Sequence, residues 1–288
     1  MNNLIKEAWD ILKNNSNLYN APILIWFLSD LLRVSYSPSI AFIVSITALG
    51  CINIAITSGW YNQIKVVLKT KEKSTFDDLL TGIGKYFNNI LSGNIALLIL
   101  FFISSIVVYT IAENFININD SQLKDIQKVY NEISKMKPEQ ITNYIKNIHP
   151  EIMSITYKWT LVILSYMGVA ALFYFFISLW TQISVFTGEI WFQGWKKSIS
   201  LIKKNIWTFT GLTLIQAWFY ILFILVNLLT NDPFIQLLLI IISIVTEAYF
   251  AVLFCLFVFR FSDNIKIEVL KDDIQSSISE IQGKDNKK

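Results

Sequence analysis

Charged residues are scarce in this sequence. Only 16% of the 288 residues are charged, whereas 54% are hydrophobic and the mean hydropathy is +0.50. In soluble domains about a quarter of all residues are charged. The composition therefore argues against a soluble domain and indicates a polytopic membrane protein. The formal net charge of +3 is too small to indicate a nucleic-acid-binding protein.

Side chains that catalyse reactions or bind metals are also few. Cys51 and Cys255 both lie in apolar runs, which argues against a disulfide framework or a cysteine metal site. The one histidine, His149, stands beside Pro150 in a polar stretch, where a solvated side chain is a simpler interpretation than a ligand or a base. The sequence has no Gly-rich phosphate loop and no His-Glu-x-x-His motif. We therefore expect no enzymatic activity, no metal and no cofactor.

The N-terminus lacks the basic segment of a cleavable secretory signal, because its first ten residues mix charges of both signs. We expect the first hydrophobic helix to remain in the mature protein. Six apolar stretches follow one another along the chain, and a bilayer core needs about 20 apolar residues. The predicted fold is thus all-α with six transmembrane spans, at about 18–34, 39–58, 91–112, 159–188, 207–230 and 233–261.

We predict one membrane domain, residues 1–261, followed by a polar cytoplasmic tail, residues 262–288. The only sizeable polar region inside the domain is residues 113–158, where apolar residues recur every three or four positions and indicate two short helices. About 46 residues can bury little core of their own. This segment is expected to pack on itself or on the spans.

A basic amphipathic segment precedes the fifth span. Its apolar residues fall three or four apart and its lysines recur seven apart, so aromatic and basic side chains occupy different faces of a helix. This pattern is typical of a helix that lies in the headgroup layer of an anionic leaflet. A helix packed on a soluble core, or a calmodulin target helix, would share the pattern. The predicted lipid-facing residues are Trp191, Trp195, Lys196, Lys197, Lys203 and Lys204.

Positive charge predicts the orientation of the chain. Most of the lysines and arginines fall in the N-terminus, in the loops after the second and fourth spans, and in the tail. The lysines of the loop 113–158 are balanced by acidic residues. We therefore expect a plasma-membrane protein with both termini in the cytoplasm and with the loop 113–158 outside the cell.

A threefold internal repeat is suggested by an alignment on Asn15, Asn89 and Asn205. A small residue stands seven positions earlier in each case: Ala8, Gly82 and Ser198. Each block then runs into a hydrophobic hairpin, so the repeated unit would be one interfacial helix and two spans. Such repeats are common in transporters, where binding sites form between them, and they also arise by plain duplication.

Two motifs carry a resemblance to known proteins. The stretch Ser74–Gly82 with Tyr86–Asn89, and Trp195–Ser198 with Lys203–Asn205, resemble uncharacterised six-helix membrane families of bacteria and archaea. These families are in turn similar to the membrane domain of some glycerophosphodiester phosphodiesterases. The resemblance implies a six-helix membrane fold over most of the chain. The soluble barrel of the phosphodiesterases and its acidic and histidine motifs are absent here, so no catalytic residue is implied.

Glu247 is the most informative polar residue, because it lies near the middle of the sixth span. An ionised carboxylate at that depth costs at least about 2.5–3.5 kcal/mol. The carboxyl group is therefore protonated, paired, or directed into a wet interior. It is either a site for a proton or a polar substrate, or a neutral group that joins helices by hydrogen bonds. Candidate hydrogen-bond partners are Ser104, Ser105, Tyr166, Gln216 and Tyr249. Asp30 is a weaker candidate than Glu247 for a functional polar residue in the membrane.

The leading functional hypothesis is a membrane accessory, scaffold or regulatory protein that engages anionic inner-leaflet lipid or another membrane protein. The absence of a catalytic motif and the basic amphipathic helices motivate it. The alternative is a small-solute or lipid transporter, or a permease subunit with its ATPase on another chain, which Glu247 and the repeat motivate. An intramembrane lipid enzyme is a third hypothesis, for which the sequence offers no set of residues.

Overall fold

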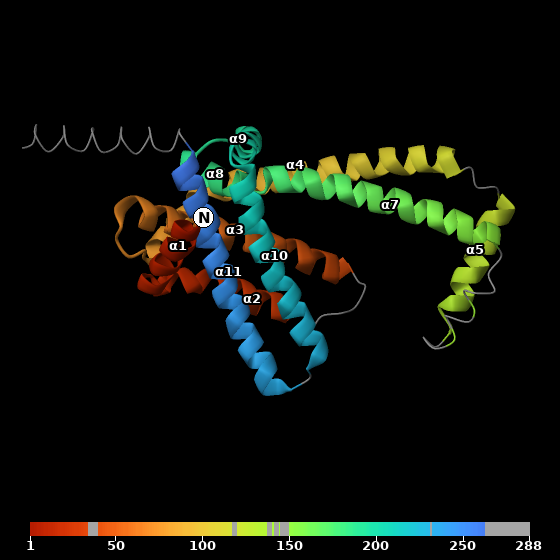
Figure 1. Ribbon diagram of the computed structural model, residues 1–288, viewed down its shortest axis with the longest axis horizontal. Helices are drawn as coiled ribbons and strands as arrows, with labels where there is room; N and C mark the ends of the chain where they lie inside the picture. The colour runs from red at the N-terminus through yellow and green to blue at the C-terminus, as the bar shows by residue number, and fades with distance from the viewer. Residues whose placement is uncertain are drawn as a thin grey trace, which may run out of the picture. The chain divides into compact units, whose positions relative to one another are not determined.

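The computed structural model describes residues 1–33, 40–116, 120–136, 140, 144, 150–230 and 232–262 (Figure 1). These residues form helices and their connections, and no strand occurs among them. The predicted all-α class is thus confirmed. His149 and the tail beyond Ser262 lie outside the described residues, as does the side chain of Asp30.

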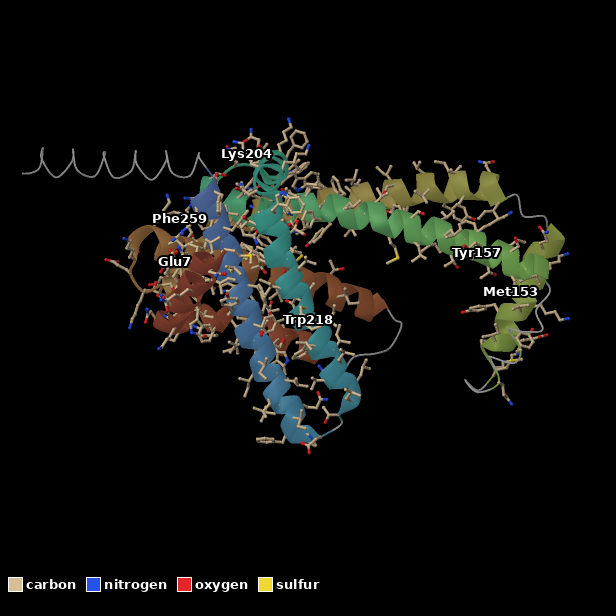
Figure 2. All side chains as sticks on the ribbon, viewed as in Figure 1. Glu7, Met153, Tyr157, Lys204, Trp218 and Phe259 are labelled. Atoms are coloured by element: carbon tan, nitrogen blue, oxygen red, sulfur yellow. The ribbon has the colours of Figure 1, made fainter. Side chains whose placement is uncertain are left out.

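In the part of the chain that is described, four helical segments are long and apolar enough to cross a membrane. They are Phe76–Asn114, Ile152–Thr187, Ile206–Leu229 and Pro233–Phe261. Many of their large apolar side chains are exposed, including Trp218 on the third segment and Tyr157 on the second (Figure 2). Lipid tails are the natural environment for such a surface, so the segments are those of a multi-pass membrane protein.

Several element bounds differ from the predicted ones. Helix α4, Phe76–Ile116, includes the predicted third span and the segment before it in one helix of 41 residues. No proline interrupts this run. The predicted fourth span is divided instead, into α7, Pro150–Ile177, and α8, Trp180–Thr187. The polar region is correspondingly shorter than predicted, because α4 and α7 both extend into it, and its described helix is α5, Asp120–Ile133.

The first two predicted spans correspond to α2, Asn20–Arg33, and α3, Ile40–Thr70. Helix α2 has 14 residues, and residues 34–39 lie outside the description. Helix α3 does not end near Ser58 but continues for another three turns.

The chain divides into two compact units. Unit 1 comprises residues 1–94 and 176–288. It contains α1, Asn2–Asn14, the short 3₁₀ helix η1, Ser16–Tyr19, and α9, Trp191–Lys204, together with α2, α3, the first half of α4, α8 and the hairpin described next.

The hairpin consists of α10, Ile206–Leu229, and α11, Pro233–Phe261. Asp232 caps α11, because its carboxylate accepts hydrogen bonds from the amides of Phe234 and Ile235 at 2.8 and 3.2 Å. The second half of α11 is the centre of unit 1. It packs against α1, α2, α3, α8 and α10 and is buried almost without interruption from Ala248 to Val258.

Helices α3 and α4 cross at two glycines. A Cβ atom on Gly82 would lie 2.8 Å from the Cα atom of Gly59 and 2.5 Å from the Cβ atom of Asn62. Next to this crossing, Asn62 donates to the carbonyl of Asp78 at 2.8 Å. A reciprocal cap between Thr75 and Asp78 forms the N-terminus of α4, and the Asp78 carboxylate accepts from the Thr75 amide at 2.7 Å. Small residues thus bring the backbones of the two helices together.

Unit 2, residues 95–175, is built on an antiparallel pair of helices, the second half of α4 and α7. Tyr166 joins them through hydrogen bonds of 2.8 and 2.9 Å with the hydroxyls of Ser104 and Ser105. Ala112, Ile116 and Ile155 form a small core at the far end of the pair. Beyond this core, the Tyr144 hydroxyl donates to the Glu132 carboxylate, and this bond raises the pKa of Tyr144.

The glycine crossing predicts a contrast between two substitutions in α4. Gly82→Ala is expected to lower the free energy of unfolding by about 1–3 kcal/mol, because the added methyl meets backbone and Cβ atoms that cannot move easily. Gly84→Ala is the matched control, since its Cβ would have no neighbour within 4 Å. It should raise stability by up to about 1 kcal/mol through helix propensity. Thermal unfolding in detergent micelles would measure both, and equal effects would contradict the close crossing.

Candidate functional site

Helix α9 is the amphipathic helix that the lysine spacing predicts, and it ends at Lys204. Its buried face, however, consists of Gly194, Ser198, Leu201 and Ile202. The predicted apolar stripe, which includes Trp191, Trp195 and Ile199, lies at the edge of this face and is half-buried. The contact is centred on small residues because they let α9 approach α8 closely. A Cβ atom on Gly194 would lie 2.5 Å from the Ser184 hydroxyl oxygen.

The two tryptophans of α9 belong to an aromatic cluster. The ring centroids of Trp191 and Trp195 lie 4.7 Å apart, and Trp180 of α8 meets Trp195 edge-on at 6.5 Å. Gly93 of α4 makes room for this cluster, since a Cβ atom there would lie 2.4 Å from the Trp180 ring. Trp191 and Trp195 therefore pack between helices to a large extent, and their contact with lipid stays a prediction.

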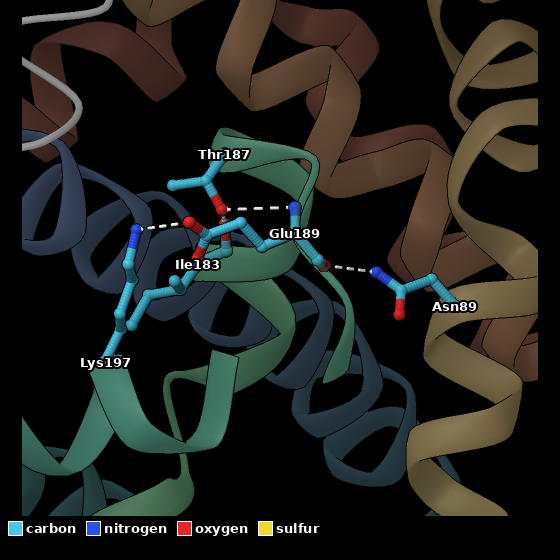
Figure 3. Close-up of polar contacts among 5 residues, drawn as sticks. All are labelled: Asn89, Ile183, Thr187, Glu189 and Lys197. Atoms are coloured by element: carbon cyan, nitrogen blue, oxygen red, sulfur yellow. Dashed lines mark hydrogen bonds and ion pairs between the residues drawn. The ribbon is translucent and has the colours of Figure 1, made fainter. Parts of the chain in front are cut away.

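A tight turn connects α8 to α9 (Figure 3). Gly188 takes a left-handed conformation with φ of 71°, which ends α8 and which other residues rarely adopt. Asn89 of α4 holds this turn from the side. Its amide nitrogen donates to the Glu189 carbonyl at 2.5 Å, and its oxygen accepts from the Trp191 amide at 2.9 Å. One side chain thus satisfies a donor and an acceptor at the start of α9.

A second buried side chain fixes α9 from the other direction. The hydroxyl of Ser198 is fully buried, donates to the Phe176 carbonyl at 2.9 Å and accepts from the Leu179 amide at 3.2 Å. These two backbone groups lie at the break between α7 and α8, where the regular helical hydrogen bonds are interrupted. Ser198 therefore supports the break that sequence reasoning missed.

The lysines of α9 have different environments. Lys197 forms an ion pair of 2.5 Å with Glu189 (Figure 3), and Lys196 lies over the ring of Phe192 at 4.5 Å from its centroid. Lys203 and Lys204 are exposed in the last turn, at the negative end of the helix dipole, which favours cations.

Helices α1 and α9 meet the same end of α11. The Arg260 guanidinium near the end of α11 donates to the carboxylate of Glu7 on α1. On another side of that end, a cavity of about 120 Å³ is lined by residues that include Lys197 and Lys204 of α9 and Phe261 of α11. Figure 2 shows Glu7, Phe259 and Lys204 gathered at this end. We call it the basic end, defined by Lys197, Lys204 and Arg260.

A further lysine joins α3 to its neighbours in the same unit. Lys65 donates to the Tyr86 hydroxyl of α4 at 2.9 Å and to the Val185 carbonyl of α8 at 2.8 Å. The ammonium also lies 5.3 Å from the centroid of the Tyr86 ring. This cation connects three helices and was predicted only as one of several loop lysines.

The other candidate, Glu247, is half-buried in α11. Its carboxylate interacts electrostatically with Tyr220 of α10, which also contacts Gln216. The other expected partners are engaged elsewhere: Ser104, Ser105 and Tyr166 bond with one another in unit 2, and the Tyr249 hydroxyl donates to the Ile5 carbonyl at 3.3 Å. Among the described residues, no cluster of His, Cys, Asp or Glu could hold a metal ion.

Comparisons with protein-family models, with curated proteins and with solved structures gave no match to this chain. The resemblance to six-helix membrane families stays a prediction.

Asn15 and Asn205, which the repeat alignment pairs, take the same role. Each ends an amphipathic helix and donates its side-chain amide to the carbonyl four residues earlier, at 2.8 and 3.1 Å. The residues seven positions before them, Ala8 and Ser198, are both fully buried. Asn89 differs, because α4 continues through it and its side chain reaches across to another helix. The threefold repeat stays a prediction.

The clamp at Asn89 gives a test of how α9 is held. Asn89→Ala is expected to lower the free energy of unfolding by about 1–3 kcal/mol, because two hydrogen bonds are lost and backbone groups are left unpaired. Asn88→Ala is the control, since Asn88 is its exposed neighbour on the same helix. Limited proteolysis between α8 and α9 should accelerate in the first variant alone. Equal proteolysis of the two variants would show that Asn89 does not hold the turn.

Proposed function

We propose that this chain is a six-span plasma-membrane accessory, scaffold or regulatory protein without catalytic chemistry of its own. Its basic end engages anionic lipid of the inner leaflet, or another membrane protein seated there. In this account α2 and α3 contribute the first two spans, and the four long apolar segments contribute the others. Both termini lie in the cytoplasm and the loop 113–158 lies outside.

The observation that carries the proposal is the meeting of α1 and α9 at one end of α11. Both helices are amphipathic, and both end in basic residues, Lys13 in one and Lys203 and Lys204 in the other. The opposite end of the same hairpin has no lysine or arginine, because none occurs between Lys204 and Arg260. Positive charge is thus collected at one end of a hydrophobic hairpin, as the positive-inside rule expects.

The energy available at such a surface is moderate. Each lysine near an anionic leaflet contributes about 1 kcal/mol, so a few exposed lysines of α1 and α9 bind lipid in a reversible manner. The half-buried tryptophans add apolar contact at the interface. This strength suits recruitment or regulation of a neighbour more than a permanent catalytic complex.

Cross-linking in the native membrane tests the proposal. A tagged copy at native expression level would be cross-linked, extracted mildly and analysed by mass spectrometry for bound proteins and lipids. We expect a stoichiometric membrane partner or an enriched anionic lipid, with cross-links on α1 and α9. Recovery of the protein with neither would contradict the proposal.

Transport is the second candidate, and Glu247 favours it. A carboxylate that interacts with Tyr220, within a largely apolar hairpin, is the type of site that proton-coupled carriers use. Such a carrier would act alone on a small solute or lipid, or as a permease with its ATPase on another chain.

Glu247→Gln separates the two candidates. The amide has the same shape as a neutral carboxyl group, so the accessory account expects unchanged folding and unchanged recovery of lipid or partner. The measurement is the native-membrane cross-linking repeated with the variant, together with solute uptake into proteoliposomes. Uptake that is driven by a proton gradient and lost in this variant would support transport instead.

Cysteine labelling tests the orientation. In a background in which Cys51 and Cys255 are replaced by alanine, Lys204→Cys should react with an impermeant maleimide only after the membrane is opened. Asn231→Cys, between α10 and α11, should react in intact cells. The reverse pattern would show that the basic end faces outward.

A further inference from the structure

A cavity of about 530 Å³ lies between α1 and the hairpin of α10 and α11. This is the size of a small-molecule site. Nine of its ten lining residues are apolar, aromatic or hydroxyl-bearing, and the tenth is Lys6. Helix α1 contributes Ile5, Lys6 and Trp9, whereas the hairpin contributes Ile215, Phe219, Val245, Thr246, Tyr249, Phe250 and Leu253.

The wall formed by α1 is held in place by polar contacts. Tyr249 donates to the Ile5 carbonyl, and its ring meets Trp9 edge-on at 6.2 Å. The contact between Ile5 and Tyr249 therefore lies beside the cavity and does not close it. Phe219 is 47% exposed at the rim, so the cavity is open toward the apolar surface of the hairpin.

Lys6 is the charged residue of this cavity. Its side chain is exposed, and it has no ion pair or hydrogen bond with any residue that the structure describes. The neighbouring acidic residue, Glu7, is already paired with Arg260. An unpaired ammonium at the rim of an apolar cavity is complementary to a ligand with a negative head and a hydrocarbon chain.

We infer that this cavity binds one anionic phospholipid, with an acyl chain between α1 and the hairpin and with the phosphate at Lys6. The inference rests on the proposed function and gives it a specific ligand site. Trp9, at the same rim, has the amphipathic ring that prefers the headgroup level of a bilayer. The membrane itself supplies the ligand, which enters laterally past Phe219.

Photo-cross-linking from Phe219 tests the inference in the full chain. Benzoylphenylalanine would replace Phe219, and the protein would be reconstituted in vesicles of phosphatidylglycerol and phosphatidylcholine in equal amounts. Mass spectrometry would identify the adducts after illumination. We expect a phospholipid adduct in which phosphatidylglycerol is enriched about fivefold, the effect of one lysine near an anionic head.

Two charge variants test whether Lys6 recognises the anionic headgroup of the phospholipid. Lys6→Gln should abolish the enrichment, whereas Lys73→Gln, which removes an exposed lysine between α3 and α4 that does not line the cavity, should keep it. Equal adduct yields of phosphatidylglycerol and phosphatidylcholine in the protein that carries benzoylphenylalanine but no charge variant would overturn the inference. An adduct with residues 263–288 or with a second copy of the chain would also overturn it, because the cavity would then have another occupant.

A third variant tests the cavity itself. Val245→Phe fills the space from α11 and should remove the phospholipid adduct while the thermal unfolding midpoint without lipid stays near that of the unsubstituted protein. An unchanged adduct would place the lipid outside the cavity. If the inference fails in this way while native-membrane cross-linking still recovers a partner or an anionic lipid on α9, the proposed function survives without this site.

Discussion

Hydrogen bonds from the buried Ser198 and the half-buried Asn89 to interrupted backbone are the interaction on which unit 1 depends. The chain breaks its helical path twice within about ten residues, between α7 and α8 and again at Gly188. A break in a helix leaves amides and carbonyls without their regular partners, which is costly in apolar surroundings. Ser198 satisfies groups at the first break, and Asn89 satisfies groups at the second. Helix α9 can turn away from the preceding span because these two residues are present.

The position of the charges follows from this arrangement. With α9 held against α8, Lys197 and Lys204 reach the end of α11, where Arg260 pairs with Glu7 of α1. Small residues allow the same closeness elsewhere: Gly59 and Gly82 at the crossing of α3 and α4, and Gly93 beneath the tryptophans. In a membrane the hydrophobic effect does little to join helices, so close packing and hydrogen bonds must do it. The proposed surface for lipid or a partner is thus a consequence of contacts between small and amide side chains.

Much of this could be predicted from the sequence, and the rest could not for physical reasons. Hydrophobicity located the hairpin of α10 and α11 within one or two residues. The continuity of α4 and the break after Ile177 were not predicted, because an apolar run has the same sequence pattern whether it forms one helix or two. The buried face of α9 was not predicted, because glycine and serine carry little hydrophobic signal yet mark the closest contact. Asn89 did appear in the repeat alignment, but its role depends on a contact with residues 100 and 102 positions away.

Helix α9 is proposed to lie at the surface of the membrane, with its exposed side toward the headgroups. Spin labels at Gln193 and Ser200, both exposed on α9, and at Leu214, exposed on α10, would measure depth in phosphatidylglycerol-containing vesicles. We predict that a polar nickel relaxation agent and oxygen both reach the two α9 labels, whereas oxygen alone reaches the label at Leu214. Labels on α9 that lie as deep as Leu214, with oxygen alone reaching them, would contradict it.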